Sequence, residues 1–235
     1  MVTAMQIQLT RGLGAAVVLG LSLAACSAPR PTSTGTLRAE TYAYDDGAGS
    51  TGRVFRAVGA DGAEALHGET DLASGLHVVE DAVLDARGHL ARLELVVTRG
   101  CEGPEEEHVV LDRARGTVRA AAPGGLVEWP VATDAPWALG PLARGGTTPI
   151  TAWIIRQAAA GSPRVRVVDA DARSSYRAPS DQIAVDTELG ATVVLGRDAA
   201  QIDGAFVQRV DLADGRLALT RTDAAARKLA CASLD

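Results

Sequence analysis

Apolar and polar residues alternate in short runs along most of the chain after residue 36, and glycine and aspartate separate the runs. Successive side chains of a β-strand point to opposite faces, so alternation over about four to eight residues indicates a half-buried strand. Such runs cover residues 37–44, 53–58, 63–69, 164–168, 182–187, 192–195, 205–212 and 216–222. The pattern predicts a mainly β body, treated as a single domain over residues 37–235.

Three segments share a hairpin pattern, in which the alternation stops at an aspartate and resumes after a glycine. The aspartate side chain caps a tight turn, and the glycine adopts the positive φ that the return of the chain requires. The segments are residues 83–97, 109–119 and 210–219. Hairpins favour an antiparallel arrangement. We therefore predict an antiparallel curved sheet or half-barrel, with a β-sandwich as the alternative.

One segment near the middle of the chain has helical rather than strand periodicity. Thr148 is a suitable N-cap, and Pro149 fits the first helical position. Apolar residues then recur on one face of a helix, at Ile150, Trp153 and Ile154. Together these signals predict one amphipathic helix at about residues 148–160, buried against the sheet by Trp153.

The first 25 residues form a short apolar segment whose single charge is Arg11. The apolar run is shorter than the ~20 residues that a membrane-spanning helix needs. A basic start, an apolar core and small residues at the end are typical of a secretory signal. Residues 1–25 are therefore expected to be a signal peptide.

Leu23-Ala24-Ala25-Cys26 resembles, residue for residue, the lipobox of bacterial lipoproteins. The resemblance implies that processing makes Cys26 the mature N-terminus and attaches diacylglycerol to its sulfur, usually with an amide-linked palmitate-like chain. Two or three acyl chains anchor a protein stably to a membrane. Residues 26–36, rich in Ser, Pro and Thr, then form a flexible tether. Ser27 follows the cysteine, at the position where lipoproteins retained in the inner membrane often carry aspartate. By this resemblance we expect the protein at the periplasmic face of the outer membrane.

Charge and cysteine content narrow the class of protein further. The chain has 23 Lys+Arg against 29 Asp+Glu and a formal net charge of −6, so nucleic acid is not an expected partner. Cys101 and Cys231 are the other two cysteines, and a pair in an exported protein predicts a disulfide. Two free buried thiols are the alternative.

Catalytic and metal-binding motifs are not recognisable in the sequence. The histidines lack the spacing that places two ligands on one helix face; they are His67, His77, His89 and His108. The acidic stretch at residues 102–107 could hold a hard cation, but a solvated loop has the same composition. No nucleophile, base or oxyanion site can be assigned. We therefore expect a non-enzymatic protein with no catalytic residue, metal or cofactor.

An apolar group in the middle of the chain is the candidate ligand site. It consists of Trp129, Trp137, Ile150, Trp153 and Ile154, and its alternative interpretation is ordinary core packing. The order of elements resembles envelope proteins of the lipoprotein-carrier type, whose half-barrel is plugged by helices and holds acyl chains. This chain departs from them in offering only one good helix.

The resemblance implies a membrane-anchored envelope lipoprotein that binds lipid or another apolar ligand in a curved-sheet cavity. The alternative is an accessory or scaffold subunit of an envelope protein complex. Such a subunit would use an exposed sheet edge or the acidic residues 105–107 to contact its partner.

Overall fold

The structure is a computed structural model, and it describes part of the chain. The described residues are 36–122, 125–131, 133, 136–139, 148–160, 162, 164–169, 174–179, 184–185, 191–195, 198–203, 205–212 and 217–222. The predicted signal peptide, most of the predicted tether and Cys231 lie outside them. Strands make up most of the described chain, which confirms the mainly β prediction.

The N-terminal part of the chain is a run of eight strands. They are β1 (Thr36–Asp45), β2 (Thr51–Gly59), β3 (Glu64–Asp71), β4 (Leu76–Leu84), β5 (Leu90–Arg99), β6 (Glu105–Asp112), β7 (Thr117–Ala122) and β8 (Gly125–Pro130). Each pairs antiparallel with the next, as the hairpin pattern predicts, with a register shift in the pairs β1–β2, β4–β5 and β5–β6.

The second part of the chain contains the helix and the remaining strands. These are β9 (Trp137–Leu139), α1 (Pro149–Ala160), β10 (Arg164–Asp169), β11 (Ser174–Pro179), β12 (Ala184–Val185), β13 (Ala191–Leu195), β14 (Asp198–Ile202), β15 (Val207–Leu212) and β16 (Leu217–Thr222). The bounds of α1 confirm the helix predicted at about 148–160.

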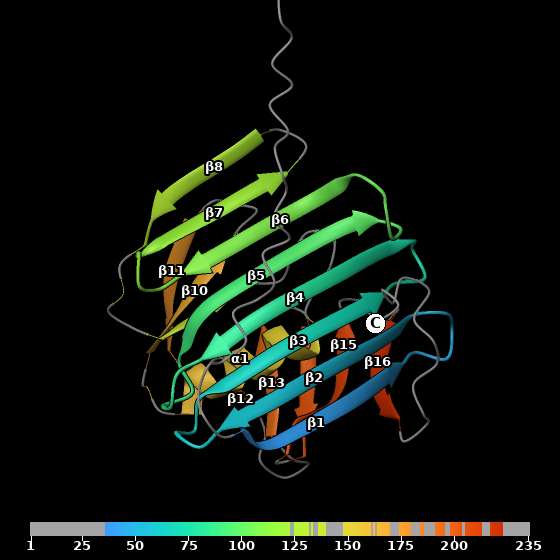
Figure 1. Ribbon diagram of the computed structural model, residues 1–235, viewed down its shortest axis with the longest axis horizontal. Helices are drawn as coiled ribbons and strands as arrows, with labels where there is room; N and C mark the ends of the chain where they lie inside the picture. Colours follow the sequence, from blue (N-terminus) through green and yellow to red (C-terminus); the bar gives the residue numbers. More distant parts are fainter. Residues whose placement is uncertain are drawn as a thin grey trace, which may run out of the picture.

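The two ends of the described chain are joined in one 13-stranded sheet. Its order is β12-β13-β14-β15-β16-β1-β2-β3-β4-β5-β6-β7-β8. The link is the antiparallel pairing of β1 with β16, where Tyr44 lies opposite Arg221. In Figure 1 the strands from β1 to β8 form the broad front layer, and β12, β13, β15 and β16 turn back behind its lower half. The sheet is therefore strongly curved, as predicted.

A small second sheet has the order β11-β10-β9. Its β9 and β10 run parallel, with Trp137 opposite Arg166. This pair differs from the wholly antiparallel arrangement that we predicted. Parallel neighbours need a crossover connection, and α1 lies between β9 and β10 in the chain, so it is part of that crossover.

Alternation from Val78 to Leu84 in β4 and from Leu93 to Val97 in β5 places one set of side chains on the concave face of the large sheet. Val78, Ala82 and Leu84 of β4 are buried there, and so are Leu93 and Leu95 of β5. The intervening residues are partly exposed on the convex face. The apolar half of the alternation therefore faces the interior.

The turn between β4 and β5 has the predicted aspartate–glycine chemistry. The Asp85 carboxylate accepts hydrogen bonds from the backbone N–H groups of Arg87 and His89, each at 2.9 Å. Gly88 has a φ of 76°, which side-chain-bearing residues rarely adopt. The first of the three predicted hairpins therefore has the turn geometry on which its prediction depended.

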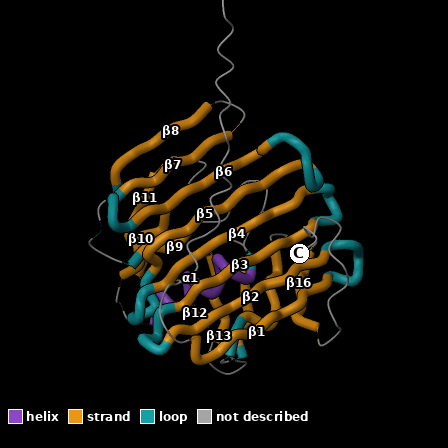
Figure 2. The backbone as a smooth tube through the Cα atoms, in the orientation of Figure 1, coloured by secondary structure: helices purple, strands orange, loops and turns teal. Residues whose placement is uncertain are grey.

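Helix α1 lies inside the curve of the large sheet. It contacts β3 and β4 on one side, β13 and β15 on another, and β9 and β10 of the small sheet. Figure 2 shows the helix among strands that belong to both parts of the chain. The interior of the described chain is consequently one continuous apolar cluster that includes the helix and both sheets.

Candidate functional site

The candidate site is the concave face of the large sheet together with the helix that occupies it. Most of α1 is buried, at Pro149, Ile150, Thr151, Ala152, Trp153, Ile154, Ile155 and Ala158. A helix that is apolar on nearly all sides belongs in a core. The helix therefore occupies the space in which a half-barrel would hold an apolar ligand.

The N-terminus of α1 is closed by a reciprocal pair of threonines. Thr148 Oγ1 accepts the backbone N–H of Thr151 at 3.1 Å, and Thr151 Oγ1 accepts the backbone N–H of Thr148 at 2.8 Å. Both side chains are buried. The pair satisfies N–H groups that have no partner within the helix, as a capping box does.

A buried carboxyl lies directly beneath this cap. Thr148 Oγ1 donates a hydrogen bond to Oε1 of Glu80 at 2.7 Å, and Glu80 is 2% exposed on the concave face of β4. Burial raises the pKa of Glu80 to about 7, although the hydrogen bond from Thr148 acts in the opposite direction. Near neutral pH this carboxyl is therefore divided between its neutral and charged forms.

A glycine on the neighbouring strand makes room for the helix. Gly68 of β3 lies opposite Glu80 in register, and a Cβ built at Gly68 would lie 2.7 Å from Cδ1 of Ile150. Real Cβ atoms do not approach another carbon so closely. The contact shows that α1 packs against the backbone of β3 itself at this point.

The middle of α1 is fixed to the sheet by an ionic and aromatic group. Trp153 Nε1 donates to Oε2 of Glu64 at 3.0 Å, and Arg56 donates to both carboxylate oxygens of Glu64 at 2.9 Å each. The Arg56 guanidinium lies 4.9 Å from the Trp153 ring centroid. Arg56 also donates to the backbone carbonyl of Ala205 at 3.0 Å. One guanidinium thus joins β2, β3, α1 and the turn before β15.

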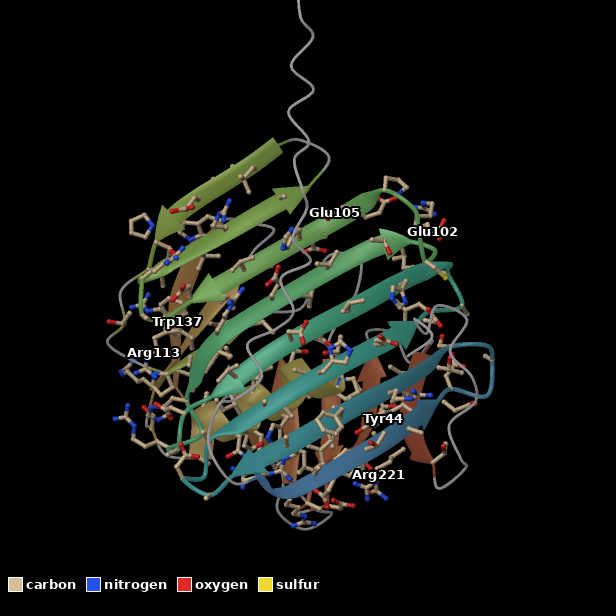
Figure 3. All side chains as sticks on the ribbon, viewed as in Figure 1. Tyr44, Glu102, Glu105, Arg113, Trp137 and Arg221 are labelled. Carbon is tan, nitrogen blue, oxygen red and sulfur yellow. The ribbon has the colours of Figure 1, made fainter. Side chains whose placement is uncertain are left out.

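Aromatic stacking continues this group toward the junction of β1 and β16. Phe206 lies 5.0 Å from Trp153 and 4.7 Å from Tyr42, measured between ring centroids. Arg221 lies 5.5 Å from the Tyr42 ring and pairs with Asp203. Figure 3 shows Tyr44 and Arg221 near the lower edge of the molecule. The interior at this end is closed by stacked rings and paired charges.

The five residues predicted to form the ligand site belong to the apolar interior. Trp137, Ile150 and Ile154 are fully buried, Trp153 is 5% exposed, and Trp129 is partly buried against the same cluster. They lie on β8, β9 and α1. The structure thus brings these residues into one cluster, in which α1 and the sheet pack directly against each other.

Two of these residues, Trp129 and Trp137, bury an indole N–H group without an acceptor in the described part of the chain. The Nε1 atoms of Trp129 and Trp137 are buried and have no hydrogen-bond acceptor among the described residues. Buried donors normally find an acceptor, and leaving one unpaired costs about 1–3 kcal/mol. Figure 3 shows Trp137 at the left side of the molecule, near the ends of the front strands. The interior therefore contains two indole donors that an acceptor could still satisfy.

The acidic stretch is largely part of a strand and not a solvated loop. Glu105, Glu106 and Glu107 belong to strand β6, and Glu107 is only 5% exposed on the concave face. Glu106 pairs with Arg99 at 3.0 Å. Glu102 is exposed in the preceding turn, and Figure 3 shows Glu102 and Glu105 at the same upper rim. Strand alternation has divided the acidic residues between the two faces of the sheet.

The histidines of the large sheet pair with carboxylates rather than with one another. His67 lies 2.9 Å from Asp81 and His77 lies 2.7 Å from Asp71. The hydrogen bond to Asp81 raises the pKa of His67. The described residues contain no cluster of three or more potential metal ligands. These imidazoles are accounted for by cross-strand contacts with carboxyl groups.

The cysteine predictions fall largely outside the described residues. Cys101, in the turn after β5, is disulfide-bonded. Cys26 and Cys231, the other cysteines of the chain, are both outside the described part, so pairing with Cys231 stays a prediction, as does lipidation of Cys26. Within the described residues, no helix has the length and apolar character needed to cross a bilayer.

Comparisons with known proteins do not place the chain in a family. No protein-family model, no curated protein and no solved structure matches it. Any functional conclusion therefore rests on the residues and geometry described above.

Apart from the Thr148 cap, the polar residues that fix α1 were not predicted from the sequence. Glu80 lies at an even position of β4 together with Val78 and Ala82, so the alternation of this strand assigns it to the apolar face. The shared even positions of Val78, Glu80 and Ala82 in the sequence could therefore have indicated a buried carboxyl. Arg56 and Glu64 had no such signal, because their contacts with Trp153 join segments far apart in the chain.

Proposed function

We propose that this chain is a membrane-anchored bacterial envelope lipoprotein without enzymatic activity, and that it binds lipid or another apolar ligand on the concave face of its curved sheet. The observation that carries the proposal is α1, an almost wholly buried apolar helix between the two arms of one sheet. An apolar ligand such as an acyl chain would occupy the same surroundings when the helix moves aside.

Polar features of the interior support a ligand with a hydrogen-bond acceptor. The unpaired indole N–H groups of Trp129 and Trp137 are donors in otherwise apolar surroundings. Ligand sites are mostly apolar with a few polar groups that fix orientation. An ester or carboxylate group of a lipid supplies the acceptor that these donors lack.

The anchor is the second support for the proposal. Cys26 ends a sequence that resembles a lipobox, and acylation there would hold the sheet at a membrane surface, where lipid is available. Labelled palmitate should attach to the wild-type chain and not to Cys26→Ala. A mature protein that begins at another residue would contradict the anchor.

Ligand binding is tested by uptake of a fluorescent fatty acid by the full chain carrying Cys26→Ala, which has no acyl group of its own. Uptake is expected, together with lipid that copurifies and is released by solvent extraction. Gly68→Ala pushes against Ile150 and loosens α1, so it should increase the rate of uptake. Absence of both copurifying lipid and uptake would contradict the proposal.

An accessory or scaffold subunit of an envelope complex is the second candidate. Strand β8 forms one edge of the large sheet, and Leu126 on this strand is 59% exposed. An edge strand can pair with a strand of another protein. Isolation of the anchored chain from membranes distinguishes the candidates, because a stoichiometric protein partner that is lost in Leu126→Asp favours the subunit.

A further inference from the structure

The carboxyl of Glu80 is buried on the concave face of the large sheet, at a position that follows from the register of β4. Gly68 of β3 lies on one side of it and Leu95 of β5 on the other. Val78 and Ala82 flank it along the strand and are buried. An ionisable group is thus enclosed by apolar neighbours and backbone.

Glu80 is bound to the first turn of α1 and not to a cation. Its partner is the hydroxyl of Thr148, at 2.7 Å, and Thr148 is at the same time the N-cap of the helix. None of the ion pairs among the described residues includes Glu80. Burial and this hydroxyl are the main influences on the pKa of the carboxyl, and the charges of Asp81 and His67 on the convex face act on it more weakly, in opposite directions.

The charged groups on the neighbouring strands face other directions. On β3, His67 and Glu69 lie on the convex face, and Glu64 lies on the concave face at the far end of the strand, where Arg56 binds it. On β4 itself, Asp81 is on the convex face and pairs with His67.

The other two elements beside Glu80 place no ion-pair partner next to it. On β5, Arg92 and Glu94 pair with each other on the convex face. On α1, the basic residue is Arg156, which is partly buried about two turns beyond Thr148. No basic side chain among the described residues therefore forms an ion pair with Glu80, and only the more distant charge of His67 favours its ionised form.

We propose that Glu80 is a pH-sensitive latch, which holds the N-terminus of α1 against the sheet when it is protonated and releases it when it is ionised. The inference rests on the proposed function, because it names the condition that opens the concave face to a ligand. The ionised carboxylate requires water, and movement of the Thr148 end of the helix admits water to it.

The direction of the pH effect follows from linkage. The pKa of Glu80 is raised from 4.5 to about 7 while the helix is docked, and a solvated Glu80 returns toward 4.5. Docking is therefore strongest below pH 4.5, weakens as the pH rises toward 7, and is constant above that. Over this range the docking equilibrium should fall by roughly a few hundred-fold.

The test is hydrogen exchange of the full chain at pH 5 and pH 8, corrected for the intrinsic pH dependence of exchange. Peptides of α1 are compared with peptides of β5 in the same samples. Protection of α1 relative to β5 should fall by roughly 70-fold between pH 5 and pH 8 in the wild type. Glu80→Gln is neutral at both values and should remove the difference.

Glu94→Gln is the matched control, because Glu94 is a carboxylate on the adjacent strand that already pairs on the convex face. It should keep the wild-type difference. If Glu80→Gln does not fold, Thr148→Val serves instead: it keeps the titrating group and removes the hydrogen bond that favours the carboxylate. The midpoint should then move to higher pH.

The latch is contradicted if α1 is equally protected at both pH values in the wild type, or if Glu80→Gln keeps the difference. Fatty-acid uptake is measured separately at each pH. Uptake with a pH-independent helix overturns the latch alone. A pH-dependent helix without uptake at either pH supports the latch and overturns the proposed ligand function.

Discussion

Arg56 shows how much of this interior depends on the geometry of a single side chain. Its guanidinium binds both oxygens of Glu64, donates to the Ala205 carbonyl and lies over the rings of Trp153 and Phe206. A planar fork can make all of these contacts at once, whereas an ammonium group cannot. The residue joins sheet, helix and turn through shape as much as through charge.

Replacing Arg56 by lysine should therefore be destabilising although the charge is kept. We expect Arg56→Lys to lower the free energy of unfolding by about 1–3 kcal/mol, through loss of the paired hydrogen bonds and the ring contact. Urea denaturation at pH 7 measures the change.

Arg92→Lys is the matched control for this prediction. Arg92 pairs with Glu94 at 2.9 Å but is 42% exposed, and exposed pairs contribute about 0–1 kcal/mol. Equal effects of the two substitutions would show that the fork geometry of Arg56 is unimportant.

At the scale of elements, α1 packs against a turn of the large sheet as well as against the strands of that sheet. Gly88, in the turn between β4 and β5, has a φ of 76°, and a Cβ there would lie 3.2 Å from Oε1 and 3.4 Å from Cβ of Gln157 on the helix. Gly75, in the turn before β4, has a similar φ of 82° but nothing within 4 Å.

Comparing alanine substitutions at Gly75 and Gly88 distinguishes the cost of backbone strain from the cost of disturbed packing against α1. Gly75→Ala should cost about 1–2 kcal/mol, the cost of a left-handed conformation with a side chain. Gly88→Ala should cost about 1 kcal/mol more, because its Cβ also presses on Gln157. Thermal denaturation of both variants measures the difference, and identical losses would mean that this turn does not support α1.

The elements that could be predicted from the sequence are those with a local signal. The 83–97 hairpin was identified because Asp85 and Gly88 have turn chemistry that repeats in other hairpins, and α1 was identified because Thr148 and Pro149 precede a periodic apolar face. Strands β11 and β14 were missed, since neither has a clear alternation of apolar and polar residues.

What the sequence could not provide is the set of contacts between distant segments. The hydrogen bond from Thr148 to Glu80 and that from Trp153 to Glu64 each depend on where α1 lies in the curve of the sheet. Within the candidate site, the apolar residues could be predicted because their hydrophobic side chains are grouped in the middle of the sequence. The polar residues that bind them to the sheet were not, apart from the Thr148 cap.

At the scale of the whole molecule, the disulfide decides between two arrangements of the chain. Cys101 is disulfide-bonded, the chain has two other cysteines, Cys26 and Cys231, and pairing with Cys231 stays our prediction. Only the pairing with Cys231 leaves Cys26 free to be acylated, so the disulfide and the anchor are linked predictions.

Mass spectrometry of a non-reduced digest should find the Cys101 peptide joined to the Cys231 peptide. Reduction should then lower the stability by about 3–5 kcal/mol, since the bond closes a long loop. A peptide that joins Cys26 to Cys101 would contradict both the pairing and the lipid anchor.

The pairing of β1 with β16 has a consequence for how this protein is made. Tyr44 near the start of the body and Arg221 near its end are direct neighbours, and the Tyr44 hydroxyl donates to the Val207 carbonyl at 2.7 Å. The curve of strands around α1 is therefore complete only after the last of them has been synthesised. A chain cut short before residue 207 lacks β15 and β16, which join the rear strands to β1, and leaves one side of the apolar helix uncovered, a species prone to aggregate.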